Sequence, residues 1–211
     1  MRAWGDLPGD DPKRDREATE AELHAAGIDL HPTPPHAHPH QHTEPGEPPV
    51  IGIVGAGAVG TALGVALSRA GWPIHAVASR DASRRARFRA LVDVDRAFID
   101  PEPLVEEVEL IILAVPDDAI APLAGTFRLY SGQAMIHTSG ALGAEVLAPA
   151  KAAGTQIGSF HPLVAFADTE RAVADLHGAT VAIEADDPLA ALLAAMAEAI
   201  GSTPVRLAPG V

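Results

Sequence analysis

The sequence predicts an α/β protein with a doubly wound, mostly parallel sheet, and three observations carry this prediction. Short apolar runs alternate with segments of helical periodicity between residues 50 and 207, as they do in successive βαβ units. The run LIILAV at 110–115 is continuously apolar, which is typical of a strand buried on both faces. The run VIGIV at 50–54 leads directly into the glycine pattern GAGAVG at 55–60.

The elements follow from these patterns in chain order. Helical spacing at 59–70 ends at Gly71, a residue suited to the left-handed backbone of a helix end. Pro116, Asp117 and Asp118 open a helix after the central strand, and Asp187 is expected to cap the helix that Pro188 begins. Strands are predicted at 50–54, 74–78, 110–115, 134–137, 156–160, 180–183 and 204–207, and helices at 59–70, 82–92, from 116, and at 188–200.

The first 49 residues differ from the rest of the 211-residue chain. They hold nine of the 19 prolines, and five histidines lie between residues 31 and 42. We expect residues 1–49 to form a disordered polar tail, with a short helix at 16–27, in front of a Rossmann domain at 50–211. A solvated tail is favoured over a metal-handling tract, because a flexible segment supplies no fixed ligand geometry. No metal site is predicted.

Composition excludes several classes of function. A net charge of −13 argues against binding nucleic acid or anionic membrane through a broad basic face. The absence of cysteine excludes disulfides and thiolate chemistry. No apolar run is long enough to cross a bilayer, and the N-terminus lacks the apolar core of a secretory signal. We therefore expect a cytoplasmic protein.

The glycine pattern predicts a dinucleotide site because it follows a strand and opens a helix. Gly55 permits the tight turn, Gly57 lets a pyrophosphate approach the backbone, and Gly60 allows close packing of helix and strand. The backbone of Ala58 and Val59 belongs to the first helical turn, whose free N–H groups and dipole attract phosphate.

The end of the second strand predicts which cofactor binds. An NAD site usually has an acid there, whereas this chain has Ser79 and Arg80, with Arg84 and Arg85 one helical turn later. A hydroxyl and a guanidinium accept a 2′-phosphate that an acid would repel. NADP(H) is therefore predicted, and NAD is less favoured.

The ends of later strands supply the other candidate site residues. Val115, Pro116 and Asp117 are expected beside a cofactor ribose, although Asp117 and Asp118 also fit as simple N-caps. Thr138, Ser139 and His161 follow the next two strands; the hydroxyls could orient a substrate, and His161 is the candidate general acid. The alternative for His161 is a loop-shaping role, and His137 is interpreted as a core residue.

Five segments together resemble a known family. They are IGIVGAGAVG at 51–60, SR at 79–80, LAVPDDAI at 113–120, HTSGAL at 137–142 and GSFHPLVAF at 158–166. The chain from Val50 to about Pro209 resembles the N-terminal domain of Rossmann-like proteins that carry a C-terminal domain of unknown function. That family is related to pyrroline-5-carboxylate reductases, ketopantoate reductases and deazaflavin-dependent NADP oxidoreductases.

The resemblance implies an oxidoreductase that moves a hydride between NADPH and a small carbonyl or imine substrate, by analogy a keto acid. Relatives continue into a helical domain that supplies much of the substrate pocket and the dimer interface. These 211 residues stop where the resemblance places the start of that domain, so we expect the chain to be either a fragment or a natural half. A homodimer and full catalysis are therefore expected only with that domain. The alternative reading is a non-catalytic, nucleotide-sensing or partner-binding Rossmann module.

Overall fold

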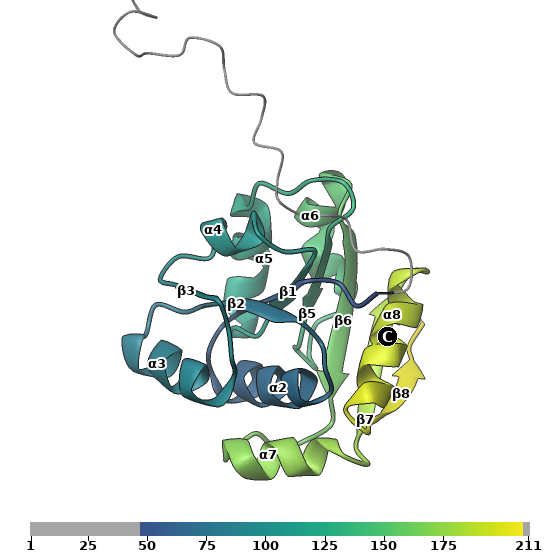
Figure 1. Ribbon diagram of the computed structural model, residues 1–211. Helices are drawn as coiled ribbons and strands as arrows, with labels where there is room; N and C mark the ends of the chain where they lie inside the picture. The colour runs from purple at the N-terminus through teal and green to yellow at the C-terminus, as the bar shows by residue number, and fades with distance from the viewer. Residues whose placement is uncertain (1–46, 209–211) are drawn as a thin grey trace, which may run out of the picture. The chain divides into compact units, whose positions relative to one another are not determined.

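The computed structural model describes residues 47–208. The helix predicted at 16–27 and the histidine-rich tract lie outside this range, as does all but the last three residues of the predicted tail. Within 47–208, strands and helices alternate along the chain (Figure 1). No helix in the described range has the length and apolar content needed to span a membrane.

A single eight-stranded sheet organises the domain, with strand order β3-β2-β1-β4-β5-β6-β7-β8. The first six strands in chain order pair in parallel, β7 runs antiparallel to β6, and β8 is parallel to β7. The strands are β1 (Ile51–Val54), β2 (Ile74–Ala78), β3 (Arg96–Phe98), β4 (Leu110–Leu113), β5 (Ala134–His137), β6 (Gln156–Pro162), β7 (Thr180–Ala185) and β8 (Thr203–Arg206).

Helices cover both faces of the sheet. Side chains from α2 (Ala58–Arg69), α3 (Ala82–Leu91), α7 (Thr169–Leu176) and α8 (Leu189–Ala199) contribute to the core on one face. Side chains from α4 (Glu102–Val105), α5 (Asp117–Thr126), the 3₁₀ turn η1 (Ala144–Leu147) and α6 (Ala148–Ala152) contribute to the core on the other. Alternate residues of the central strand β4 enter opposite cores, with Ile112 in the first and Ile111 in the second.

The predicted doubly wound, mostly parallel fold is confirmed, and every predicted strand is present. Strand β6 is longer than predicted: it continues through His161 and Pro162, which pair with Ala182 and Val181 of β7. Four short elements escaped prediction because each offers too few residues for a clear period: β3, α4, the η1–α6 pair and α7. The Asp168 carboxylate, which accepts a hydrogen bond from the backbone N–H of Arg171, was an available signal for α7.

The predicted cap of the last helix is wrong. Pro188 holds the N-cap position of α8, and no side chain caps the helix. The Asp187 carboxylate instead accepts a hydrogen bond from Arg206 of β8 at 2.6 Å. This bond is the main reason that the pKa of Asp187 lies below its ordinary value. The carboxylate therefore joins the start of α8 to the edge strand, where a cation competes successfully with the helix N–H groups.

One aromatic side chain holds α3 against the sheet. Phe88 is the single buried residue of α3, and its ring would lie 2.6 Å from a Cβ atom added at Gly64 of α2. Leu91 of the same helix is 45% exposed. Glycine at position 64 thus makes room for the ring between the two helices.

We expect Phe88→Ala to lower the free energy of unfolding by about 3–5 kcal/mol, because it leaves a cavity beneath α3. Leu91→Ala, the matched control on the exposed side, should change it by less than about 0.5 kcal/mol. Urea unfolding of both variants measures the difference. Equal losses would show that α3 does not depend on Phe88.

Candidate functional site

The glycine loop lies where β1, β4 and α2 meet. Gly55 has a φ of 108°, a left-handed conformation that favours glycine, and its N–H donates to the carbonyl of Ala78 at 2.8 Å. A Cβ atom at Gly55 would overlap the backbone carbonyl of Ala114, and one at Gly60 would overlap the carbonyl of Gly55. These two positions therefore require glycine so that loop, helix and strand can approach closely.

Gly57 differs from its two neighbours in the motif. It is the N-cap of α2 in extended conformation, and no atom lies within 4 Å of a Cβ atom added there. No side chain in the described range caps α2, and its first turn contains no acid. Open space beside uncapped N–H groups, including those of Ala58 and Val59, fits the pyrophosphate of a dinucleotide. The residues present thus satisfy the geometry that the sequence motif predicts.

Hydrogen bonds to the backbone of Ser79 hold the segment that follows β2 in place. The Ser79 N–H donates to Phe98 of β3 at 3.0 Å, and the Arg85 guanidinium donates to the Ser79 carbonyl. Arg80 is exposed and makes no hydrogen bond or ion pair within residues 47–208. Arg84 is exposed and lies 3.6 Å from the carboxylate of Asp81. Arg80 is therefore the cation at this strand end that has no competing partner in the described region.

Asp81 is an acid next to the predicted 2′-phosphate site and is not among the site residues predicted from the sequence. Its Oδ1 accepts hydrogen bonds from the N–H groups of Ser83 and Arg84 and from the Ser83 hydroxyl. The hydroxyl bond is the largest of the causes that lower the pKa of Asp81. Asp81 therefore caps α3, and the carboxylate is committed to that helix. The signal was an Asp placed directly before a helical segment.

The end of β4 lies next to the glycine loop. A Cβ atom at Gly55 would lie 3.2 Å from Val115, so Val115 borders the loop. Pro116 is the N-cap of α5, and neither Asp117 nor Asp118 makes a side-chain cap. The reading of these acids as N-caps is therefore wrong: both are exposed residues of the first helical turn. Their negative charges favour the positive end of the helix dipole without a hydrogen bond.

The ends of β5 and β6 meet through a backbone carbonyl. His161 Nδ1 lies 3.0 Å from the Thr138 carbonyl oxygen, and the imidazole occupies the space of a Cβ atom at Gly140. A carbonyl only accepts, so Nδ1 carries the hydrogen and Nε2 is the nitrogen available for proton exchange. The Ser139 hydroxyl oxygen accepts from the Ala141 N–H at 3.1 Å. The Thr138 hydroxyl is buried and points to the Leu113 carbonyl at 3.5 Å.

His137 is buried, as predicted, but it is also hydrogen-bonded. Its Nε2 lies 3.1 Å from the Gly143 carbonyl, and its Nδ1 has no partner within the described residues. Burial is the largest influence on this imidazole and lowers its pKa, while the Gly143 bond and the charges of Glu184, Asp117 and Glu145 act in the opposite direction. Burial prevails, so His137 is neutral at neutral pH.

The topology gathers these groups at one edge of the sheet. The chain leaves β1 for β2 on one side and later places β4 on the other side, so the carboxyl ends of β1 and β4 flank a topological switch point. The Gly55 loop and Val115 lie at this point, with Ser79 to one side and Thr138 and His161 to the other. Ser159 and Glu184 are two of the buried polar residues in the described range that the sequence analysis does not predict. In the sequence, Glu184 is the one acid in an otherwise mostly apolar strand, a pattern that indicates a buried carboxylate with a partner.

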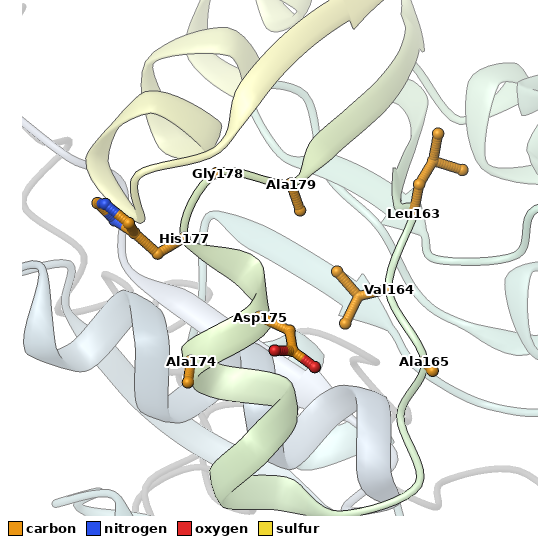
Figure 2. A pocket seen from close by; sticks show the side chains of 8 residues that line it. All are labelled: Leu163, Val164, Ala165, Ala174, Asp175, His177, Gly178 and Ala179. Atoms are coloured by element: carbon orange, nitrogen blue, oxygen red, sulfur yellow. The ribbon is translucent and has the colours of Figure 1, made fainter.

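A separate pocket of about 420 Å³ lies beyond β6, between residues 163–165 and the end of α7 (Figure 2). It contains none of the predicted site residues. The His177 ring packs against Gly201. Its lining residues are Leu163, Val164, Ala165, Ala174, Asp175, His177, Gly178 and Ala179. In the described range, no three His, Asp or Glu side chains cluster as a metal site.

Comparison with known families agrees with this geometry. The Rossmann-like domain matches residues 41–162, which cover more than half of the chain and include every candidate residue from the glycine loop to His161. The chain belongs to the Rossmann-like domain family. No curated protein matches the sequence.

Solved structures share the fold. A candidate NADP oxidoreductase from Bacteroides fragilis is 27% identical with a TM-score of 0.63, over 75% of this chain and 59% of that one. Prephenate dehydrogenase from Aquifex aeolicus, in complex with hydroxyphenyl propionate and NAD⁺, is 15% identical with a TM-score of 0.64 and the same coverage. Reductive aminase from Aspergillus terreus, in complex with NADPH and ethyl-5-oxohexanoate, is 15% identical with a TM-score of 0.58, over 76% of this chain and 55% of that one.

This Rossmann-like domain therefore spans between 55% and 59% of the length of these three chains. The agreement concerns the architecture, which the sheet order already indicates. The choice of cofactor and substrate depends on the residues at the site and does not follow from this architecture.

His137 should make stability depend on pH. The folded state keeps this imidazole neutral, whereas the unfolded chain takes up a proton near the ordinary pKa of 6.5. Stability should therefore fall as pH drops below 6.5, by at most about 1.4 kcal/mol per pH unit for one proton. His137→Gln, which does not titrate, should lose this component. Urea unfolding of both proteins between about pH 7.5 and pH 5.5 measures it, and parallel pH profiles would contradict it.

Proposed function

We propose that this domain binds NADP(H) along the carboxyl ends of β1, β2, β4 and β5 and serves an oxidoreductase. The main observation is the geometry of the glycine loop. Gly55 and Gly60 allow close backbone contacts, whereas Gly57, unlike these two glycines, leaves open space beside the uncapped start of α2. A glycine-rich turn with no ligand would not need that space. The names of the structural neighbours, which include NADP, NADPH and NAD⁺, support a nicotinamide dinucleotide.

The preference for NADP(H) rests on the residues after β2. Arg80 offers a guanidinium with no competing partner in the described region, and Ser79 offers a hydroxyl. The nearby acid, Asp81, is occupied in capping α3. Arg84 adds positive potential, reduced by its pairing with Asp81. A 2′-phosphate would thus meet donors, while the carboxylate next to Arg80 in sequence is committed to α3.

The substrate side is proposed at the ends of β5 and β6. When bound, the nicotinamide supplies the hydride chemistry. Val115, Pro116 and Asp117 would border the ribose, and Thr138 and Ser139 would orient the nicotinamide amide or a substrate carboxylate. His161, when both ring nitrogens carry a hydrogen, would give the Nε2 proton to the oxygen or nitrogen of a carbonyl or imine as its carbon is reduced. A small keto acid is the substrate class we propose, and a non-catalytic nucleotide sensor is the alternative.

We expect Arg80→Ala to weaken NADPH binding about ten-fold to a hundred-fold, because a charge-assisted hydrogen bond contributes roughly 1.5–3 kcal/mol. NADH affinity should hardly change, since NADH has no phosphate there. Arg89→Ala, an exposed arginine at the other end of α3, is the matched control and should change neither. Fluorescence titration with both cofactors measures this. Equal wild-type affinity for NADH and NADPH would refute the assignment.

Gly57→Val should abolish binding of both cofactors, because its side chain would fill the pyrophosphate space. The thermal midpoint should stay close to that of the wild type, since nothing lies within 4 Å of the added Cβ atom. Gly60→Val is the contrasting control and should lower the midpoint, because its Cβ atom would overlap the Gly55 carbonyl. Retained NADPH binding in Gly57→Val would show that the dinucleotide does not lie over this loop.

Hydride transfer separates the oxidoreductase from the sensor. NADPH carrying deuterium at C4 is incubated with a panel of keto acids and imines, using the 211-residue chain and any longer protein that contains it. Deuterium in a reduced product supports the oxidoreductase. NADPH binding with no transfer to any compound by the longer protein supports the sensor.

A further inference from the structure

One peptide group beside the proposed substrate site is held on both sides by buried side chains. The carbonyl oxygen of Gly143 lies 3.1 Å from His137 Nε2, and the N–H of Ala144 donates to Glu184 Oε2 at 2.9 Å. These carbonyl and N–H groups belong to the same amide. His137 and Glu184 are 0% and 6% exposed, so both bonds form away from solvent.

The sheet determines the spacing of the two side chains. His137 of β5 pairs with Ser159 of β6, and Ser159 pairs with Glu184 of β7. Residues that pair in register share one face of a sheet, so His137, Ser159 and Glu184 form a polar row across three neighbouring strands. The row faces the core that contains η1, whose first residue is Ala144. The rigid sheet thus fixes the loop that follows β5.

The unpartnered nitrogen of His137 indicates what the residue contributes. Because a carbonyl only accepts, Nε2 carries the hydrogen and Nδ1 presents a buried lone pair that no described residue satisfies. An apolar side chain would avoid that cost. The bond to the Gly143 carbonyl is the hydrogen bond that the ring makes among the described residues. We therefore infer that the imidazole serves to donate a hydrogen bond to this carbonyl.

The other end of the same turn is also held by a histidine. His161 contacts the Thr138 carbonyl at 3.0 Å, and its ring packs over Gly140. Residues 138–144 are therefore tied to the sheet at both ends, with the Ser139–Ala141 bond between them. We refer to residues 138–144 as the β5 turn.

We propose that His137 and Glu184 are positioning residues that hold the β5 turn in the shape in which Thr138 and Ser139 meet the bound cofactor and substrate. This inference rests on the proposed function. Neither side chain touches the ligand. Each acts through the single peptide group that they share, so loss of either bond frees the same part of the turn.

Amide hydrogen exchange of the full chain tests the proposal. His137→Phe and Glu184→Leu each remove one of the two bonds to the shared peptide group, whereas His137→Gln and Glu184→Gln keep a donor and an acceptor at the same reach. Exchange at residues 139–146 should be about ten-fold faster in the two apolar variants and near wild-type in the two glutamine variants. Exchange in β1 and β4 should be unchanged in all four, which separates local release of the turn from general destabilisation.

The double variant His137→Phe/Glu184→Leu sharpens the test. Because both bonds hold one peptide, its turn should exchange no more than about two-fold faster than that of the faster single variant. Independent effects would multiply instead. Unchanged exchange in both apolar single variants, or glutamine variants as fast as the apolar ones, would overturn the proposal.

Cofactor titration links the β5 turn to the site. The apolar variants should weaken NADPH and NADH binding by the same factor of about three to ten, because the 2′-phosphate end is untouched. The glutamine variants should restore both affinities. Faster exchange with unchanged affinity would overturn the positioning role. A wild-type protein that binds neither cofactor would overturn the proposed function itself, and the exchange result would still decide whether the two side chains hold the turn.

Discussion

Close backbone approach at the glycine loop is the constraint on which the rest of the structure depends. The Cβ positions of Gly55 and Gly60 would overlap the carbonyls of Ala114 and Gly55, so β1, β4 and α2 can meet only without side chains there. This contact brings the start of α2 to the carboxyl edge of the sheet. It also places Val115 beside the loop and leaves the space at Gly57 open. Packing and ligand access thus have a common origin.

Electrostatics at this edge is local. The chain carries a net charge of −13, yet the start of α2 has no acid and Arg80 has no partner in the described region. The acid closest in sequence, Asp81, is bound to the first turn of α3. A helix N-terminus and one guanidinium can attract phosphates because their field acts over a few ångströms. Salt screens the surface carboxylates that lie farther away than a Debye length, so these charges contribute little at the site.

The two ends of the proposed site are built by different means. The proposed phosphate side consists of glycines and backbone groups, which are fixed by the β1–α2 connection itself. The proposed substrate side is a turn that follows β5, and buried or half-buried side chains from β5, β6 and β7 contact this turn. Antiparallel β7 places Glu184 opposite Ser159, so the one antiparallel pairing of the described sheet brings Glu184 to the turn that follows β5. The domain spans 55–59% of the length of the three structurally similar chains, which share the fold of this part.

The sequence alone determined the strands other than β3, the main helices and the glycine loop, because the apolar period and the steric needs of glycine act over a few residues. It also identified His137 as buried. Only the tertiary structure decided that Asp187 pairs with Arg206 instead of capping α8, that Asp81 is committed to α3, and that β6 continues through His161. It alone joined His137 and Glu184, 47 positions apart, on one peptide group. Partners of polar side chains depend on strand order and register, and no local pattern encodes these.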